Sequence, residues 1–447
     1  MAIPTVSAAH PAERCSIFRT EACTSEPRCR CHTFNWQAPI ESFLSPHRRS
    51  GSPVLTEPDL GERIALLRST LHAYPLPVAE GSVADRLFNA LVDRLGIDRV
   101  FAFLRHRGVA HAALAAFGRH GQVSAPDGPF AIYHRVSQVM DRTHRREVAR
   151  IAKAFRAAEL PLVAFKGVTM NAALGRTLTP AYSGDVDVLV RSHDLTRARD
   201  AMQDLGYGTA LRLRAGRAHK MPPSVLEATE NSVYSFGQLT PLDRLVPAAE
   251  LEDQSTRVLA LFPAFFCRIS GKLHMRLSVD LHYSLNHLSD DIGTRVKPSE
   301  EVWLEDVQTV DIEGTEVVTL SPKTLSWVLP HRLYVDTALL QDSSLKTLCH
   351  LKLLWHHGRF DGEYVRHVAQ RYPYLAPSLY YALRAMDQLC GTQAQPLLDP
   401  DSIRTSRAPL MNVGDCLPTW LGCTVEVTLG ALEDSEAVES SVTTTVV

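Results

Sequence analysis

Two aspartates stand two residues apart in the segment Ser183-Gly-Asp-Val-Asp-Val-Leu-Val190. On an extended strand, residues i and i+2 project to the same face, so Asp185 and Asp187 would hold their carboxylates side by side. Two like charges at that separation are costly unless a cation lies between them, and carboxylate oxygens are the hard ligands that suit Mg²⁺. The segment therefore predicts a site for Mg²⁺, with Mn²⁺ as a substitute, of the kind that stabilises phosphoryl transfer. The alternative for an acid-x-acid strand is a solvated edge face or a pair of salt-bridge partners.

A third carboxylate usually completes a two-metal site, and Asp280 is the natural candidate. It lies in Lys272–Ser284, where polar and apolar residues alternate without a break. This period of two predicts a strand with one face in the core and Asp280 on the polar face. His282 shares that face, and it either orients Asp280 or the acceptor or is a packed core histidine.

A candidate phosphate-binding turn precedes the acidic segment. Lys166-Gly167 follows the short apolar strand 162–165 and precedes the helical turns 168–175. Amides at a helix start attract phosphate, and a lysine there adds a point charge for it. Gly184, just before the acidic pair, permits close approach of a ligand to the backbone.

These residues would be positioned by a strand–helix–strand–helix unit. Strand 162–165, the turns 168–175 and strand 183–190 are followed by a helix that Ser192 can cap and Gly206 can stop. Strand 272–284 and a hairpin at 306–320 complete the core. The expected fold class is α+β, with a small mixed β-sheet core flanked by N-terminal and C-terminal helical regions.

The rest of the chain divides around this core by its patterns. The expected regions are a Pro- and Cys-containing extension at 1–58, a helical region at 59–160, the core at 161–320 with a less regular insertion or lid at about 207–270, a helical region at 321–392 and a mostly irregular tail at 393–447. Cys15, Cys23, Cys29, Cys31 and His32 leave a zinc site open as an alternative for the extension, although their spacing fits no common paired pattern.

The ordered motifs resemble a known family. The segments Leu162-Val-Ala-Phe-Lys-Gly167, Ser183-Gly-Asp-Val-Asp-Val-Leu-Val190, Asp204-Leu-Gly-Tyr207 and Val279-Asp-Leu-His-Tyr-Ser-Leu285 are similar to those of the uncharacterised nucleotidyltransferase family in the DNA polymerase β-like superfamily. The Ser321-Pro322 turn that opens the C-terminal helices also matches. The resemblance covers roughly 130–390.

The resemblance implies a Mg²⁺-dependent enzyme that moves a nucleoside monophosphate from an NTP to an acceptor and releases pyrophosphate. The implied metal ligands and catalytic residues are Asp185, Asp187 and Asp280. The implied nucleotide-binding residues are Lys166, Gly167, Ser183, Gly184 and His282. An arginine often found before the Gly-Asp pair is missing, since Ala181, Tyr182 and Ser183 stand there, and Arg176 is a possible substitute. A catalytically inactive nucleotide-binding or interaction module is the alternative.

Composition and charge limit the classes of partner that the chain is expected to bind. The chain has 447 residues and a formal net charge of −2, which argues against a general nucleic-acid coat protein. A small-molecule or peptide acceptor is preferred over nucleic acid, although Arg212, Arg214, Arg217 and Lys220 form a local basic cluster. The longest apolar run, Val258–Cys267, is too short to cross a bilayer. Nine cysteines, an odd number, favour free thiols and a cytoplasmic location.

Overall fold

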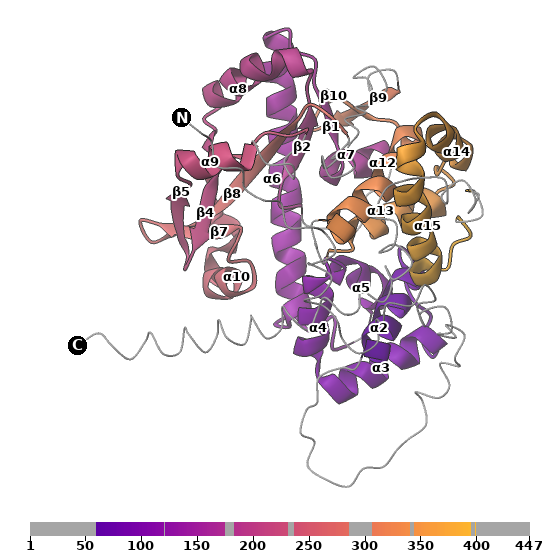
Figure 1. Cartoon of the computed structure of the whole chain (residues 1–447). Helices are drawn as coiled ribbons and strands as arrows, with labels where there is room; N and C mark the ends of the chain where they lie inside the picture. The colour runs from indigo at the N-terminus through magenta and orange to yellow at the C-terminus, as the bar shows by residue number, and fades with distance from the viewer. Residues whose placement is uncertain are drawn as a thin grey trace, which may run out of the picture. The chain divides into compact units, whose positions relative to one another are not determined.

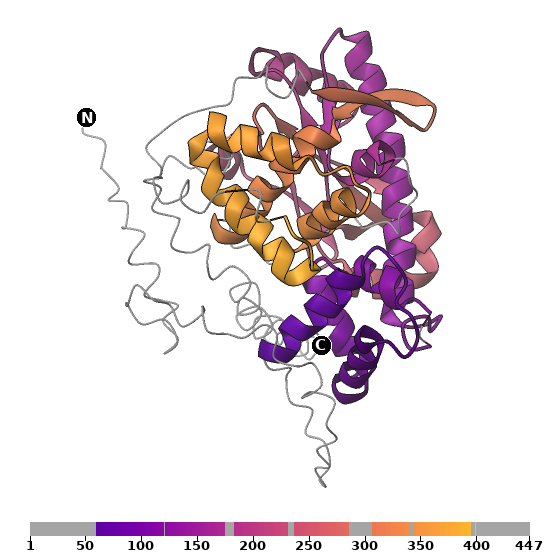
Figure 2. The same cartoon turned by 90° about the vertical axis from the view of Figure 1, so that its right-hand side faces the viewer.

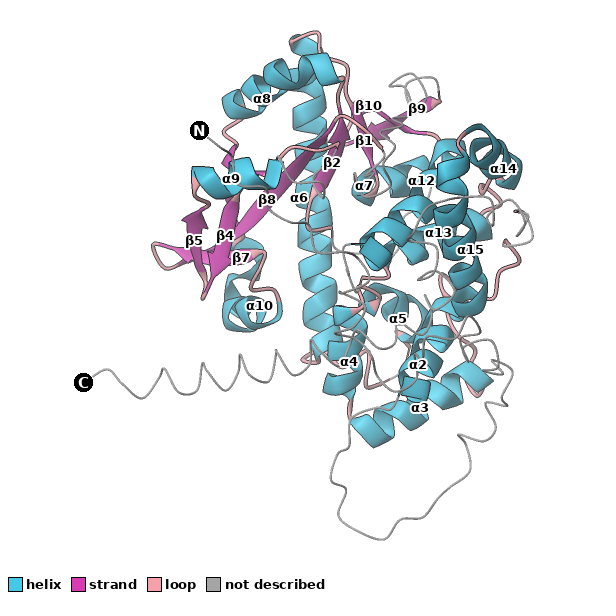
Figure 3. Ribbon diagram, in the orientation of Figure 1, coloured by secondary structure: helices cyan, strands magenta, loops and turns pink. Residues whose placement is uncertain are grey.

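The structure is a computed structural model, and it describes residues 60–119, 121–174, 183–230, 237–285, 306–339, 344–394 and 398. The zinc candidates of the extension, Arg176, Ala181 and Tyr182 lie outside the described residues. Mixed helices and strands make up the described part, so the expected α+β class is confirmed (Figure 3). The regional divisions, including 1–58 and 393–447, stay predictions.

A mixed sheet of eight described strands forms the core (Figure 1). Its order is β3-β6-β8-β2-β1-β10-β9, and β7 pairs with part of β8. β2 runs parallel to β8, whereas β1 is antiparallel to β2 and parallel to β10. The strands are β1 Val163–Phe165, β2 Val186–Leu189, β3 Gly208–Thr209, β6 Leu242–Pro247, β7 Phe266–Ile269, β8 Lys272–His282, β9 Val307–Ile312 and β10 Thr315–Leu320.

The long strand β8 confirms the period-two pattern. All of its odd-numbered residues are buried, whereas Lys272, His274, Arg276 and Asp280 are more exposed. The strand ends at His282 rather than at Ser284, because the amides of Tyr283 and Ser284 both donate to the carbonyl of Gly237 instead. Strand β2 is also shorter than expected. Asp185 lies just before it, in a turn where Ser183 Oγ donates to the Asp185 carbonyl (2.9 Å).

The region 207–270 is more regular than its sequence suggests. Strand β6 lies inside the sheet, and every residue of β6 pairs with a residue of β8. A separate two-stranded ribbon, β4 Leu211–Arg214 with β5 Arg217–Lys220, lies beside it, and two short helices follow, α9 Pro223–Glu230 and α10 Ser255–Leu261. The sheet therefore takes strands from this region as well as from the expected core.

Five helices precede the core, and the last of them packs on the sheet. They are α2 Leu60–Ala73, α3 Val83–Leu95, α4 Ile97–His106, α5 Ala110–Phe117 and the long α6 Pro129–Ala157. Pro129 opens α6 because proline is tolerated in the first turn, where its missing N–H is not needed. Helix α6 runs along the sheet and contacts β9, β10 and α8 Leu195–Asp204 (Figure 1). Ser192 lies in a short 3₁₀ turn instead of capping α8, so this helix begins later than expected.

Buried Glu147 links α6 to the core through hydrogen bonds. Its carboxylate accepts hydrogen bonds from Tyr207 Oη (2.7 Å), Arg244 (2.8 Å) and Arg150 Nε (3.0 Å). The two guanidinium groups also lie over the ring of Tyr207. A carboxylate with only 5% of its side chain exposed is tolerated because three donors surround it.

The C-terminal helices begin as the Ser321-Pro322 turn suggests. Ser321 Oγ accepts from the amide of Thr324 and caps α12 Pro322–Tyr334. The helices α13 Lys346–His356, α14 Gly362–Arg371 and α15 Ala376–Cys390 follow. Helix α15 contacts α2, which brings both helical regions together (Figure 2). None of the described helices is long and apolar enough to cross a membrane.

Candidate active site

The parallel pairing of β2 and β8 brings two of the three candidate acids together. Asp187 stands opposite Asp280 in register, so both side chains project from the same face of the sheet. His282 lies two residues further along that face, and its Nε2 is 3.0 Å from Asp187 Oδ1. One possible ligand atom from each of the three residues lies within 4.8 Å of the others. Only described residues enter this comparison.

Asp185 lies beside this group but outside it. Ser183 Oγ is 3.3 Å from Asp185 Oδ1, which holds the side chain in the turn before β2. Its charge still acts on Asp280, where it raises the pKa more than the charge of Asp187 does. Asp185 is therefore close enough to act on Asp280 electrostatically, although His282 and not Asp185 completes the closest group.

The two paired carboxylates have opposite electrostatic surroundings. Burial alone would raise the pKa of Asp187, but the charge of Lys166 and the hydrogen bond from His282 outweigh it and hold that pKa below its usual range. Burial and then the charges of Asp185 and Asp187 raise the pKa of Asp280 well above its usual range. Asp280 Oδ1 is buried and has no hydrogen-bond partner among the described residues. A divalent cation would relieve both the repulsion and the missing contact, so these residues fit a metal site.

His282 is placed to support Asp187. The ring is buried, and burial lowers its pKa despite the carboxylate beside it. The neutral ring must therefore donate its Nε2–H to Asp187 Oδ1. A hydrogen bond of this kind fixes the orientation of a carboxylate that ligates a metal.

The Lys-Gly turn lies against the acidic group. Lys166 Nζ is 3.2 Å from Asp187 Oδ1, and the backbone of Lys166 has φ 61° and ψ −167°, a region that favours glycine. The short helix α7 Gly167–Ala173 follows it. A Cβ on Gly167 would lie 3.1 Å from Ser183 Oγ, so the expected nucleotide-binding residues of the two turns touch.

Gly184 leaves room for the ring of Phe265. A Cβ at this position would lie 2.6 Å from the ring of Phe265. Phe265, which follows α10, therefore makes a close approach to the backbone at this glycine. Whether Gly184 also meets a nucleotide stays a prediction.

Sequence reasoning missed a cation from the C-terminal helices. Lys346, at the start of α13, places Nζ 3.2 Å from Ser183 Oγ, and 163 positions separate the two residues in the chain. No local motif marks Lys346. The only available signal is that lysine is scarce, with eight residues in the whole chain.

The basic cluster of the sequence lies on the β4–β5 ribbon. Register pairs Arg214 with Arg217 and Arg212 with His219, which gathers these side chains on one face. All four are exposed, as is Lys220. Among the described residues none of these five takes part in an ion pair, so the ribbon presents a cationic surface to solvent.

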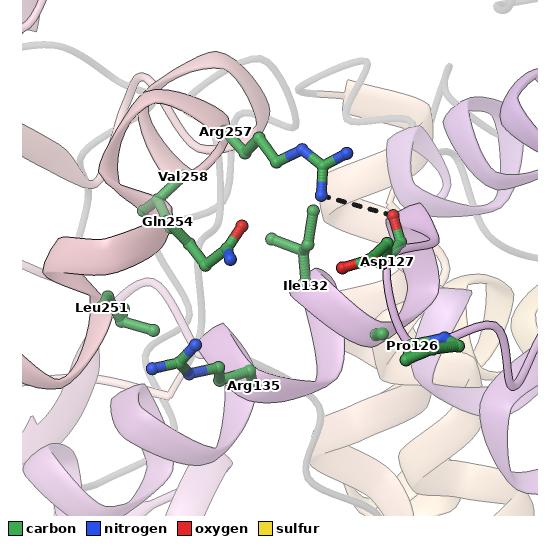
Figure 4. Close-up of a pocket in the computed structure, with 9 residues that line it drawn as sticks. Pro126, Asp127, Ile132, Arg135, Leu251, Gln254, Arg257 and Val258 are labelled. Carbon is green, nitrogen blue, oxygen red and sulfur yellow. Dashed lines mark hydrogen bonds between the residues drawn. The ribbon is translucent and has the colours of Figure 1, made fainter.

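A surface pocket lies elsewhere, between α6 and α10 (Figure 4). Its two arginines are engaged. Arg257 donates to the carbonyl of Asp127 (3.4 Å), and Arg135 pairs with Asp253 (2.7 Å). None of Lys166, Asp185, Asp187, Asp280 and Lys346 lines this pocket. We assign it no part in the chemistry.

Comparison with known proteins agrees with the motif order. No curated protein and no solved structure gives a significant match to the chain. One family model does match, that of an uncharacterised nucleotidyltransferase, over residues 93–391. The matched range includes the acidic group, Lys166 and Lys346. Because the match extends over more than half of the chain, this protein belongs to the uncharacterised nucleotidyltransferase family and is a transferase of that class.

Proposed function

We propose that this protein moves a nucleoside monophosphate from an NTP to an acceptor and releases pyrophosphate, with Mg²⁺ held by Asp185, Asp187 and Asp280. Mn²⁺ has ligand preferences close enough to replace it. The observation that carries the proposal is the pairing of Asp187 with Asp280, whose buried Oδ1 lacks a partner among the described residues. Such an oxygen is expensive to bury unless it meets a cation or a donor.

The chemistry is an in-line displacement. An acceptor oxygen forms a bond to the α-phosphorus, the bond from that phosphorus to the bridging oxygen breaks, and pyrophosphate leaves. The metal ions, when bound, supply charge stabilisation for the attacking and leaving oxygens. Lys166 offers a point charge to the phosphates, and Gly167, Ser183 and Gly184 line the nucleotide. Asp280 or a group on the acceptor takes the proton of the nucleophile, while His282 orients Asp187.

The acceptor we favour is a small molecule or a peptide. The net charge of −2 gives no general attraction to nucleic acid, although the β4–β5 ribbon keeps a nucleic-acid acceptor open to test. We also infer a reducing, cytoplasmic location, because Cys267, Cys349 and Cys390 are buried free thiols.

A second candidate is a nucleotide-binding module without turnover. Two observations favour it. Ala181, Tyr182 and Ser183 replace the arginine that often precedes the Gly-Asp pair. Lys166 also forms an ion pair with Asp187 (3.2 Å), which balances the charge of that carboxylate. Titration calorimetry with Mg²⁺–NTP measures binding, and pyrophosphate release then separates turnover from binding alone.

The direct test is to incubate the protein with each labelled NTP and a cell extract and to identify by mass spectrometry what has gained a nucleotide. Asp185→Ala and Asp187→Ala should abolish labelling without unfolding the protein. Asp204→Ala is the matched control, since Asp204 is exposed at the end of α8. Full activity in both site variants would disprove the site, and pyrophosphate release by neither wild type nor control would favour the second candidate.

A further inference from the structure

Lys346 lies at the corner where the two nucleotide-binding turns meet. Its ammonium group donates to Ser183 Oγ, and the same oxygen lies beside Asp185 and against Gly167. Lys166 occupies the other side of the acidic group, at Asp187. Two lysines from different parts of the chain thus flank the residues proposed to hold the nucleotide.

The start of α13 is held in place from outside the core. The amide of Leu345 donates to the carbonyl of Arg107 (2.7 Å), between α4 and α5. Gly108 lies so close that a Cβ there would be 2.6 Å from Ser344 Oγ and 3.5 Å from Lys346 Cβ. Lys346 is therefore positioned by backbone contacts that do not depend on a bound ligand, which is what a preorganised binding residue requires.

Three buried histidines lie within the electrostatic influence of Lys346. His111, His144 and His350 are buried, burial lowers the pKa of each, and the charge of Lys346 lowers it further. His350 lies one helical turn along α13 and also feels the charges of Lys166 and Asp187. The electrostatic neighbourhood of Lys346 thus extends into the acidic group.

We infer that Lys346 binds the polyphosphate chain of the NTP, so that the C-terminal helical region supplies the cation missing before the Gly-Asp pair. The inference rests on the proposed function. An ammonium group at hydrogen-bond distance from the turn that meets the phosphates adds a charge-assisted contact. Loss of one such contact corresponds to an affinity about tenfold weaker or more.

The test compares two lysines on the same helix. Lys346→Gln should weaken binding of Mg²⁺–NTP about tenfold or more in titration calorimetry, and binding of Mg²⁺–tripolyphosphate by a similar factor. Lys346→Arg should retain most of the affinity. Lys352→Gln is the control, because Lys352 Nζ donates instead to the carbonyl of Cys390 (2.7 Å). Unchanged nucleotide affinity in Lys346→Gln would overturn the inference.

A second measurement does not require any variant to fold. Lys346 and Lys352 are both partly exposed, so each can react with an amine-labelling reagent. Mg²⁺–NTP should protect Lys346 and not Lys352 in the wild-type protein, as measured by mass spectrometry. Nucleotide binding without protection of Lys346 refutes this inference and leaves the proposed function intact. Failure of the wild type to bind any Mg²⁺–NTP refutes both.

Discussion

Asp280→Asn should stabilise the metal-free protein and at the same time weaken its stabilisation by Mg²⁺. Burial and two neighbouring carboxylates raise the pKa of Asp280, so the native state holds this proton more tightly than the unfolded chain does. The native state therefore loses stability when Asp280 must give up its proton. This loss in the free energy of unfolding is absent below about pH 4, the ordinary range of an aspartate, and grows as the pH rises. Asparagine has nearly the same shape and no charge, so it removes this loss.

The size of the effect follows from the spacing. Oxygens of Asp187 and Asp280 lie within 4.8 Å, which corresponds to a repulsion of at least about 3.5 kcal/mol at an effective dielectric constant of about 20. Lys166 offsets part of this, so the expected gain in the free energy of unfolding is about 1–2 kcal/mol in chelator at pH 8. Mg²⁺ at roughly 100 times its Kd should stabilise the wild type by about 2.7 kcal/mol. The variant lacks a ligand and should gain much less.

Urea unfolding with chelator and with Mg²⁺ measures both effects. The variant should be the more stable protein in chelator, and the wild type should be the more stable protein in Mg²⁺. Asp204→Asn is the control, since the exposed Asp204 should change neither value. The reasoning is refuted if Asp280→Asn is no more stable than wild type in chelator, or if Mg²⁺ stabilises the two proteins equally.

Three further predictions concern other parts of the structure. Lys166→Ala should raise the KM for NTP about tenfold with little change in kcat, because the lysine binds ground state and transition state alike. Steady-state kinetics measure both constants. An unchanged dependence of the rate on NTP concentration would exclude Lys166 from the site. Glu147→Gln should lower the free energy of unfolding by about 2 kcal/mol, because two partly exposed arginines lose their shared carboxylate, and nucleotide affinity should be unchanged; urea unfolding and calorimetry test this. Burial lowers the pKa of His144 to about 4 and that of His331 to about 3, and nearby cations add to the shift. Because the unfolded chain takes up protons at these histidines first, stability should fall as pH drops below about 6.5, by about 2 kcal/mol per histidine at pH 5; equal unfolding free energies at pH 7.5 and pH 5 would contradict this.

Local periodicity carried the sequence reasoning where it succeeded. The alternation along β8 identified the strand and placed Asp280 and His282 on its polar face, because a period of two needs only the local sequence. The acid-x-acid segment likewise pointed to Asp187, whose partner on β8 follows from parallel pairing. The turn before β2 was not foreseen, because a serine-to-backbone hydrogen bond replaces the ladder at Asp185.

The features that could not be predicted from the sequence depend on packing between distant segments. Strand β6, Leu242–Pro247, carries two charged residues and ends in proline, so neither hydropathy nor propensity marks it as an inner strand. It becomes one only by pairing with β8. The contact between Lys346 and Ser183 has no local signal either, since it depends on how α13 docks.

The hydrogen bond from the Leu345 amide to the Arg107 carbonyl joins the two helical regions directly. Gly108 must stay small for the same contact to form, since its nearest neighbours are Ser344 and Lys346. A chimaera that exchanged only the C-terminal helices between relatives would therefore combine two segments that need not pack against each other. The residues at 107–108 and at 344–346 must therefore match one another in any one sequence, although more than half of the chain separates them.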